Sequence, residues 1–158
     1  MKLLLQPVIQ ILQLLEIKDF DDPIHEQVRD VFVVGCFTGM RFSDYSTIDT
    51  NAIRNNRLEF IQKKTGGKVT IPIHPVVNTI LKKYNNELPK VPRNNEFNRI
   101  IKIVGEKLPC LHVPFTRQVT YGRELKEIIA MKYSMISTHT SRRSALSNEY
   151  LKGTDPLI

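Results

Sequence analysis

The pattern with the clearest chemical meaning is His139-Thr140-Ser141-Arg142-Arg143, near the C-terminal end of the chain. Ser137 and Thr138 precede it, and hydroxyl side chains of this kind commonly cap the start of a helix. A spacing of three residues places His139 and Arg142 on one face of that helix. Free backbone N–H groups and the helix dipole favour an anion at the same place. The pattern therefore predicts a phosphate-binding helix start; the alternative is an ordinary surface helix with exposed charges.

A second candidate is the segment Thr38-Gly39-Met40-Arg41-Phe42-Ser43-Asp44, which follows an apolar run. Gly39 fits the end of a helix, so Arg41 is expected at a fixed point beside a rigid scaffold. Guanidinium groups stay charged and bind phosphate oxygens through paired N–H donors. Arg41 is therefore a candidate phosphate ligand. The alternative is a helix cap with a local ion pair between Arg41 and Asp44.

The third candidate is the basic segment Gln62-Lys63-Lys64-Thr65-Gly66-Gly67-Lys68. Its glycines predict a tight turn between two short strands, with Lys63 and Lys64 at the rim of the hairpin. Lysines in such a position are candidates for contact with an anion. The alternative is a solvated turn whose lysines protect the edge of the sheet.

Taken in this order, the three segments resemble the catalytic domain of the tyrosine recombinase (phage integrase) family. That family has an arginine in a Thr-Gly-x-Arg-x-x-Glu/Asp segment, a lysine on a β-hairpin before a Val-x-Ile-Pro-like strand, and a His-x-x-Arg motif that opens a late helix. The corresponding segments here are Thr38–Asp44, Lys64-Thr65-Gly66 with Val69-Thr70-Ile71-Pro72, and His139–Arg142. The stretch Ser137–Ser144 is especially similar to integrases of conjugative transposons, and the resemblance covers about residues 3–158.

The resemblance implies that four of these side chains act on a DNA phosphodiester. Arg41 and Arg142 would clamp the non-bridging oxygens, where negative charge builds up in the pentavalent transition state. Lys64 would be the general acid for the departing 5′-oxygen, with Lys63 as the competing candidate. His139 would transfer a proton or bind the phosphate. No metal ion or other cofactor is implied, because two arginines and a lysine already supply the positive charge.

Two neighbouring side chains have supporting roles in this interpretation. Asp44 would orient the groups around it. Arg143 is either structural or contacts a neighbouring phosphate. The predicted DNA-binding residues are Arg41, Lys63, Lys64, Arg142 and Arg143. The expected partners are double-stranded DNA at recombination sites and, for the full-length protein, other recombinase protomers in a synaptic tetramer.

The family's tyrosine nucleophile follows a Leu-Gly-His-like segment, a few dozen residues after the His-x-x-Arg motif, and neither feature is present here. Tyr150 is only eight residues after Arg142 on the same predicted helix, which is too near. We therefore expect residues 1–158 to be a single, C-terminally truncated catalytic domain without the N-terminal core-binding domain. The parent protein would cut and rejoin DNA through a 3′-phosphotyrosine in integration or recombination, whereas this chain alone would be inactive.

Composition supports a nucleic-acid partner without requiring one. The 23 basic and 16 acidic residues give a net charge of +7, which suits a polyanion. A non-catalytic, basic helical DNA-binding module is therefore the alternative function. Cys36 and Cys110 match no disulfide or zinc spacing, and Cys36 is expected to be buried in an apolar run. No apolar run approaches the ~18 residues of a membrane span, so we expect no membrane association and a cytoplasmic, nucleoid-associated location.

The elements that must position these residues are predicted from periodicity and caps. A first helix, with Leu4, Val8, Ile11, Leu12 and Leu15 on its buried face, should end near Ile17. Later helices are expected over residues 23–38, 43–46, 75–84, 95–107 and 138–152, and from Asp155 onward. Strands are expected over 58–63 and 68–73, with Pro72 on an edge strand, and 113–132 is either irregular or a second hairpin turning at Tyr121-Gly122. The predicted fold is α+β, mainly α-helical, with small antiparallel hairpins around one core.

Overall fold

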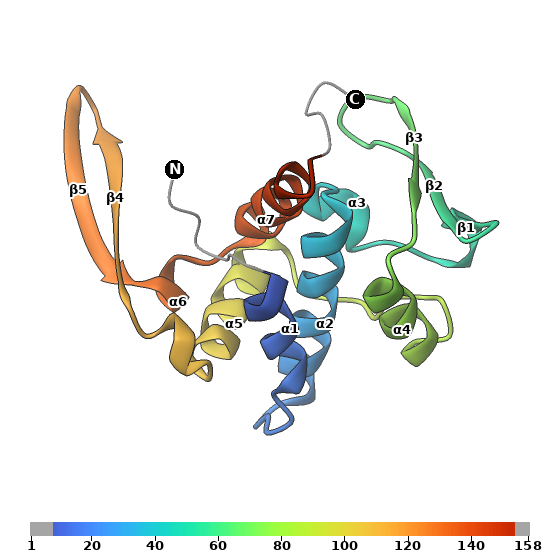
Figure 1. Ribbon diagram of the computed structural model, residues 1–158, viewed down its shortest axis with the longest axis horizontal. Helices are drawn as coiled ribbons and strands as arrows, with labels where there is room; N and C mark the ends of the chain where they lie inside the picture. Colours follow the sequence, from blue (N-terminus) through green and yellow to red (C-terminus); the bar gives the residue numbers. More distant parts are fainter. Residues whose placement is uncertain (1–7, 154–158) are drawn as a thin grey trace.

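The computed structural model describes residues 8–153, apart from the side chains of Tyr150 and Leu151 (Figure 1). The predictions for Leu4 and for a helix at Asp155 lie outside the described residues. The helices and strands are α1 (Val8–Glu16), α2 (Pro23–Thr38), α3 (Phe42–Tyr45), the 3-10 turn η1 (Thr50–Ala52), β1 (Ile53–Arg54), β2 (Arg57–Ile61), β3 (Lys68–Pro72), α4 (Pro75–Lys83), α5 (Asn94–Glu106), the 3-10 turn η2 (Pro109–Leu111), β4 (Pro114–Tyr121), β5 (Glu124–Met131), α6 (Lys132–Met135) and α7 (Thr138–Leu151).

Helix α2 is the centre of the molecule, and α1, α4, α5 and α7 all pack against it (Figure 1). Its start has the N-cap expected from Asp22-Pro23. The Asp22 side chain accepts the Ile24 N–H at 2.9 Å, and Pro23 occupies the first turn. Its end is the left-handed Gly39, with φ 67°. Every residue from Val28 to Cys36 is buried, which confirms the predicted burial of Cys36. Both ends of the helix that leads to Arg41 are therefore fixed by local sequence.

The buried apolar side chains form one cluster, to which α1, α2, α4 and α5 contribute. The predicted face of α1 was partly wrong: Ile11 and Leu14 are fully buried, whereas Leu12 is 36% exposed. The reason is that α1 packs mainly on α2, so only a narrow stripe of its surface is covered. None of the helices within residues 8–153 is long and apolar enough to span a membrane.

The first sheet has the order β1-β2-β3 and is antiparallel throughout, with Phe60 opposite Val69. Strand β3 lies at the edge, as Pro72 predicted. Strand β1 was not predicted, because it has only two residues. It turns into β2 through Asn55 and Asn56, whose φ values of 48° and 57° are left-handed. Asparagine is enriched in such turns, so this pair was the available signal.

The segment that the sequence left ambiguous is a second antiparallel hairpin, β4–β5, which extends away from the helical body (Figure 1). Tyr121 pairs with Glu124, and Gly122 takes the left-handed conformation with φ 64°, so the predicted turn is confirmed. Away from its base at α6, the hairpin leaves several large apolar side chains exposed, among them Tyr121, Leu125 and Ile129. The fold is α+β, with about 51% helix and two small antiparallel sheets.

Candidate functional site

Arg41 lies between the left-handed end of α2 and the start of α3, where it occupies the N-cap position. Its side chain is half-buried, and Nη1 donates to Oε1 of Gln62 at 3.3 Å. Among the described residues, no ion pair joins Arg41 to Asp44. The local ion pair considered as the alternative is therefore not formed. Instead, Arg41 contacts a residue 21 positions further along the chain.

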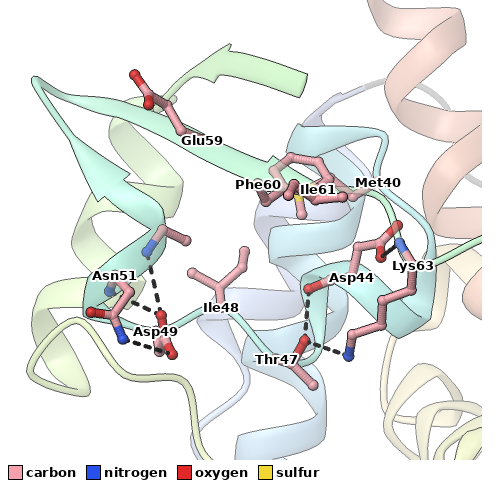
Figure 2. A pocket seen from close by; sticks show the side chains of 11 residues that line it. Met40, Asp44, Thr47, Ile48, Asp49, Asn51, Glu59, Phe60, Ile61 and Lys63 are labelled. Atoms are coloured by element: carbon pink, nitrogen blue, oxygen red, sulfur yellow. Dashed lines mark hydrogen bonds between the residues drawn. The ribbon is translucent and has the colours of Figure 1, made fainter. Parts of the chain in front are cut away.

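Asp44 ties α3 to the end of β2 (Figure 2). The residue is only 6% exposed, and its Oδ1 accepts the backbone N–H of Lys63 at 3.1 Å. Its other oxygen, Oδ2, is buried and has no hydrogen-bond partner among the described residues. A buried carboxylate of this kind fixes its partner strongly, because losing the bond would leave the charge unsatisfied. The predicted orienting role of Asp44 thus has a specific target, the backbone of the lysine turn.

The two candidate lysines lie in different environments. Lys63 is tied down, because its Nζ donates to Oγ1 of Thr47 at 3.0 Å, a contact visible in Figure 2. Lys64 is exposed at the turn, and none of the hydrogen bonds or ion pairs among residues 8–153 involves its ammonium group. Of the two, Lys64 is therefore the lysine that can reach a bound group without first breaking an internal contact.

The turn itself is closed by its backbone. The N–H of Gln62 donates to the carbonyl of Gly67 at 2.9 Å, and the N–H of Gly66 donates to the carbonyl of Gln62 at 2.8 Å. Gly66 has a left-handed φ of 69°, a conformation in which a residue with a side chain would be strained. These bonds end β2 at Ile61, two residues earlier than predicted, because Gln62 and Lys63 belong to the turn.

The start of α7 is held by α5. The backbone N–H of Thr138 donates to Oδ1 of Asn98, and the Thr138 hydroxyl donates to Oδ1 of Asn94, both at 2.8 Å. Of the two hydroxyls expected to cap α7, that of Thr138 therefore binds a neighbouring helix instead, and that of Ser137 lies 3.4 Å from the Thr140 hydroxyl. The N–H of Ser137 donates to the hydroxyl of Thr140 at 3.0 Å, which closes the first turn. The helix start that carries the predicted anion-binding residues is thus anchored on α5 and closed by a bond within its own first turn.

Helix α7 packs against α2 (Figure 1). His139 and Arg143 are exposed, and Arg142 is half-buried. Ser141, beside Arg142, is buried with its Oγ 3.4 Å from the hydroxyl of Tyr45 on α3. Ser141 therefore joins this turn of α7 directly to the helix that follows Arg41.

Two glycines of the α2 end allow this close approach. A Cβ on Gly35 would lie 2.7 Å from the Tyr45 ring and 2.9 Å from Oγ of Ser141. A Cβ on Gly39 would lie 3.4 Å from the Cβ of Ala145. The Tyr45 ring of α3 and the Ser141 hydroxyl of α7 therefore pack tightly over Gly35 of α2, and the side chain of Ala145 on α7 lies in van der Waals contact with the end of α2 that leads to Arg41.

The structure joins the three predicted segments to different degrees. Hydrogen bonds connect the Arg41 segment to the lysine turn, and tight packing connects it to α7. No hydrogen bond among the described residues joins His139 or Arg142 to Arg41 or Lys64. Two residues of this arrangement were not singled out from the sequence: Gln62, which lies within the lysine segment, and Thr47, for which the sequence holds no signal.

A cavity of about 270 Å³ lies beside this site, between α3, η1 and β2 (Figure 2). Three carboxylic acids, Asp44, Asp49 and Glu59, are among its lining residues. Lys63 is the one basic residue of this lining, so the acidic side chains make the cavity unfavourable for a phosphate. Asp49 already caps η1 by accepting the N–H groups of Asn51 and Ala52. Among the described residues, no group of three or more histidine, cysteine or acidic side chains could hold a metal ion.

Comparison with known proteins gives no match: no protein-family model fits the chain, and no curated protein is significantly similar to it. The functional interpretation therefore depends on the residues and contacts described above.

Proposed function

We propose that the chain is the catalytic core of a tyrosine recombinase, which cuts and rejoins duplex DNA through a covalent phosphotyrosine. The observation that carries the proposal is the linkage of the three motif segments. Arg41 and Asp44 reach the lysine turn through hydrogen bonds, and the turn of α7 that holds Arg142 packs on the same scaffold. A helical module that only bound DNA would have no need to tie a lysine turn to an arginine in this way.

The proposed reaction transfers a phosphodiester from one oxygen to another. A tyrosine oxygen attacks the phosphorus, the bond from phosphorus to the 5′-oxygen breaks, and a 3′-phosphotyrosine forms. Lys64 gives its proton to the leaving 5′-oxygen, so a free 5′-hydroxyl results. His139 takes up the phenol proton or binds the phosphate, while Arg41 and Arg142 bind the two non-bridging oxygens. Rejoining is the reverse of these steps, because the covalent bond conserves the energy.

The attacking tyrosine is proposed to lie outside this sequence, because none of the tyrosines in residues 8–153 suits the role. Tyr45 is fully buried, and burial raises the pKa of its phenol above the usual value. Burial and the hydrogen bond to Asp30 raise the pKa of Tyr84 to about 12. Tyr121 lies at the far end of the β4–β5 hairpin. Tyr133, in α6, packs against the apolar cluster, with its ring centroid 5.1 Å from that of His112. Eight residues of helix place the Tyr150 backbone about 12 Å along α7 from Arg142.

Covalent capture tests the proposal. A suicide substrate, nicked so that the cleaved end diffuses away, should trap the full-length gene product on DNA as a covalent adduct. The 158-residue chain should bind the same DNA but form no adduct. An adduct mapped to any of the five tyrosines of this chain would overturn the assignment of the nucleophile. A full-length protein that binds its own attachment site and never forms an adduct would favour the non-catalytic DNA-binding module.

The 158-residue chain should bind duplex DNA in a strongly salt-dependent way. For about four phosphate contacts, raising the salt from about 50 to about 200 mM should weaken binding by about two orders of magnitude, because counterions are released. Fluorescence anisotropy with a labelled duplex measures the affinity and its slope against salt. Arg143→Ala should reduce that slope by about one if Arg143 contacts a phosphate.

The matched control for Arg143 is Arg54→Ala. Arg54 is exposed at the end of the first sheet that is farthest from the lysine turn, since it pairs with Arg57 at the start of β2. Its loss should leave the slope unchanged. Affinity that does not respond to salt would count against a phosphate-binding surface.

A further inference from the structure

Gln62 holds a position that the proposed chemistry does not yet use. Its Oε1 accepts Nη1 of Arg41 at 3.3 Å and Oγ1 of Thr65 at 2.5 Å. One amide oxygen therefore connects the guanidinium of the proposed phosphate clamp to the lysine turn. The same residue closes the base of the turn through its backbone bonds to Gly66 and Gly67.

Lys64 lies between two neighbours that hydrogen bonds hold in place, and Gln62 holds one of them. On one side, Lys63 is held through its backbone by Asp44 and through its side chain by Thr47. On the other side, Thr65 is held by Gln62. The backbone of Lys64 therefore has a defined position relative to Arg41, while its exposed side chain can move.

We propose that Gln62 is a positioning residue, which keeps Lys64 in register with the phosphate held by Arg41. The inference rests on the proposed function and deepens it, because it names how a general acid on a turn is placed against the clamp. Proton transfer requires hydrogen-bond reach to the leaving oxygen, and a misplacement of about 1 Å can cost about 100-fold in rate. The hydrogen bonds of the Gln62 amide to Arg41 and Thr65 limit how far the turn can shift relative to the clamp.

The chemistry of the amide explains why glutamine suits this position. Its neutral oxygen accepts two donors at once without cancelling the charge of the guanidinium. A glutamate would form a charge-assisted pair with Arg41 and compete with the phosphate for it. An alanine would leave the Arg41 guanidinium and the Thr65 hydroxyl without their shared acceptor. The two substitutions therefore fail for different reasons, which an experiment can separate.

A substrate with sulfur in place of the bridging 5′-oxygen tests the role of Gln62. A thiol has a pKa of about 8.5, so the sulfur leaves as a thiolate and needs no proton from Lys64. In the full-length gene product, Gln62→Ala should slow cleavage of the oxygen substrate by about 10- to 100-fold. With the sulfur substrate the same variant should cleave at nearly the wild-type rate. DNA affinity, measured in parallel, should hardly change.

Three further variants show which contact of Gln62 is responsible for the slower cleavage. Lys64→Ala should show the same rescue by sulfur, because it removes the proton donor itself. Thr65→Val, which removes only the second donor to Gln62, should show a weaker defect with the same rescue and guards against a folding defect in Gln62→Ala. Gln62→Glu should be slow on both substrates, because its carboxylate occupies Arg41.

The outcomes that overturn the proposal are distinct from those that overturn the function. Equal defects of Gln62→Ala on both substrates, or no defect on either, would show that Gln62 does not act through the general acid. If the wild-type protein cleaves neither substrate, the proposed recombinase function is wrong, and the role proposed for Gln62 is wrong with it.

Discussion

Replacing Arg142 with alanine in the full-length gene product should slow formation of the covalent DNA adduct by about 10³-fold or more. Arg41→Ala should have an effect of the same size. Both side chains are proposed to bind the non-bridging oxygens, whose negative charge grows as the tyrosine attacks. Binding of intact DNA should weaken much less, since the ground-state phosphate carries less charge for these groups to stabilise. Single-turnover trapping on the suicide substrate measures the rate, and anisotropy measures the affinity.

The control for this prediction is Arg54→Ala, which removes an exposed arginine at the opposite end of the first sheet. It should leave the rate of adduct formation unchanged. Circular dichroism should show that the Arg41 and Arg142 variants remain folded, because neither side chain is part of the buried core. If the loss of rate is fully accounted for by weaker DNA binding, the two arginines are ordinary phosphate contacts and the catalytic interpretation is wrong.

The fold was predictable from the sequence where local chemistry decides it. Asp22 and Gly39 determine the ends of α2, and the glycines at 66 and 122 mark the two hairpin turns. The inner face of α1 was less accessible to prediction, because Leu12 and Leu14 are both apolar and only the tertiary packing on α2 selects between them. Periodicity identifies a helix well, but it cannot say how much of its apolar surface a neighbour will cover.

In the candidate site, too, the sequence identified residue types, whereas their contacts became known only from the structure. The motif segments and the family resemblance selected Arg41 and Lys64 as cationic candidates for phosphate chemistry, and Asp44 as a residue that orients its neighbours. The structure gives two of them partners that lie far along the chain: Gln62 for Arg41, and the backbone of Lys63 for Asp44. Asp44 was a natural ion-pair partner for Arg41 by spacing alone. A backbone N–H that the folded turn presents to the carboxylate cannot be read from a sequence.

A buried charge cluster in the first half of α2 was also not predicted. Arg29 and Asp30 are 2% and 1% exposed, and their side chains pair at 2.7 Å. The second oxygen of Asp30 accepts Nζ of Lys83 at 2.7 Å and the hydroxyl of Tyr84 at 2.8 Å. Although partial burial opposes it, bonding to Asp30 and Glu26 raises the pKa of Lys83 above its usual value. The cluster therefore joins α2 to α4 through the carboxylates of Asp30 and Glu26, of which only Asp30 is buried.

Asp30→Ala should be among the most destabilising substitutions in the chain, with a loss of about 3–5 kcal/mol in the free energy of unfolding. Removing this carboxylate leaves the buried Arg29 guanidinium without its closest charged partner and also releases Lys83 and Tyr84. Urea unfolding of the 158-residue chain, followed by circular dichroism, measures the change.

Two further variants separate loss of pairing from loss of packing. Glu26→Ala removes a carboxylate that is 40% exposed, bonds the same Lys83 and lies 3.3 Å from Nη2 of Arg29. Because Asp30 still pairs with Arg29 in this variant, the substitution should cost no more than about 1 kcal/mol. The double variant Arg29→Met with Asp30→Leu replaces both buried charges by apolar side chains of similar size. It should be clearly more stable than Asp30→Ala alone, because no unpaired charge is left in the interior. If the double variant is as unstable as Asp30→Ala, the carboxylate stabilises the protein mainly through its bonds to Lys83 and Tyr84 on α4 and its neighbouring turn, and not by compensating Arg29.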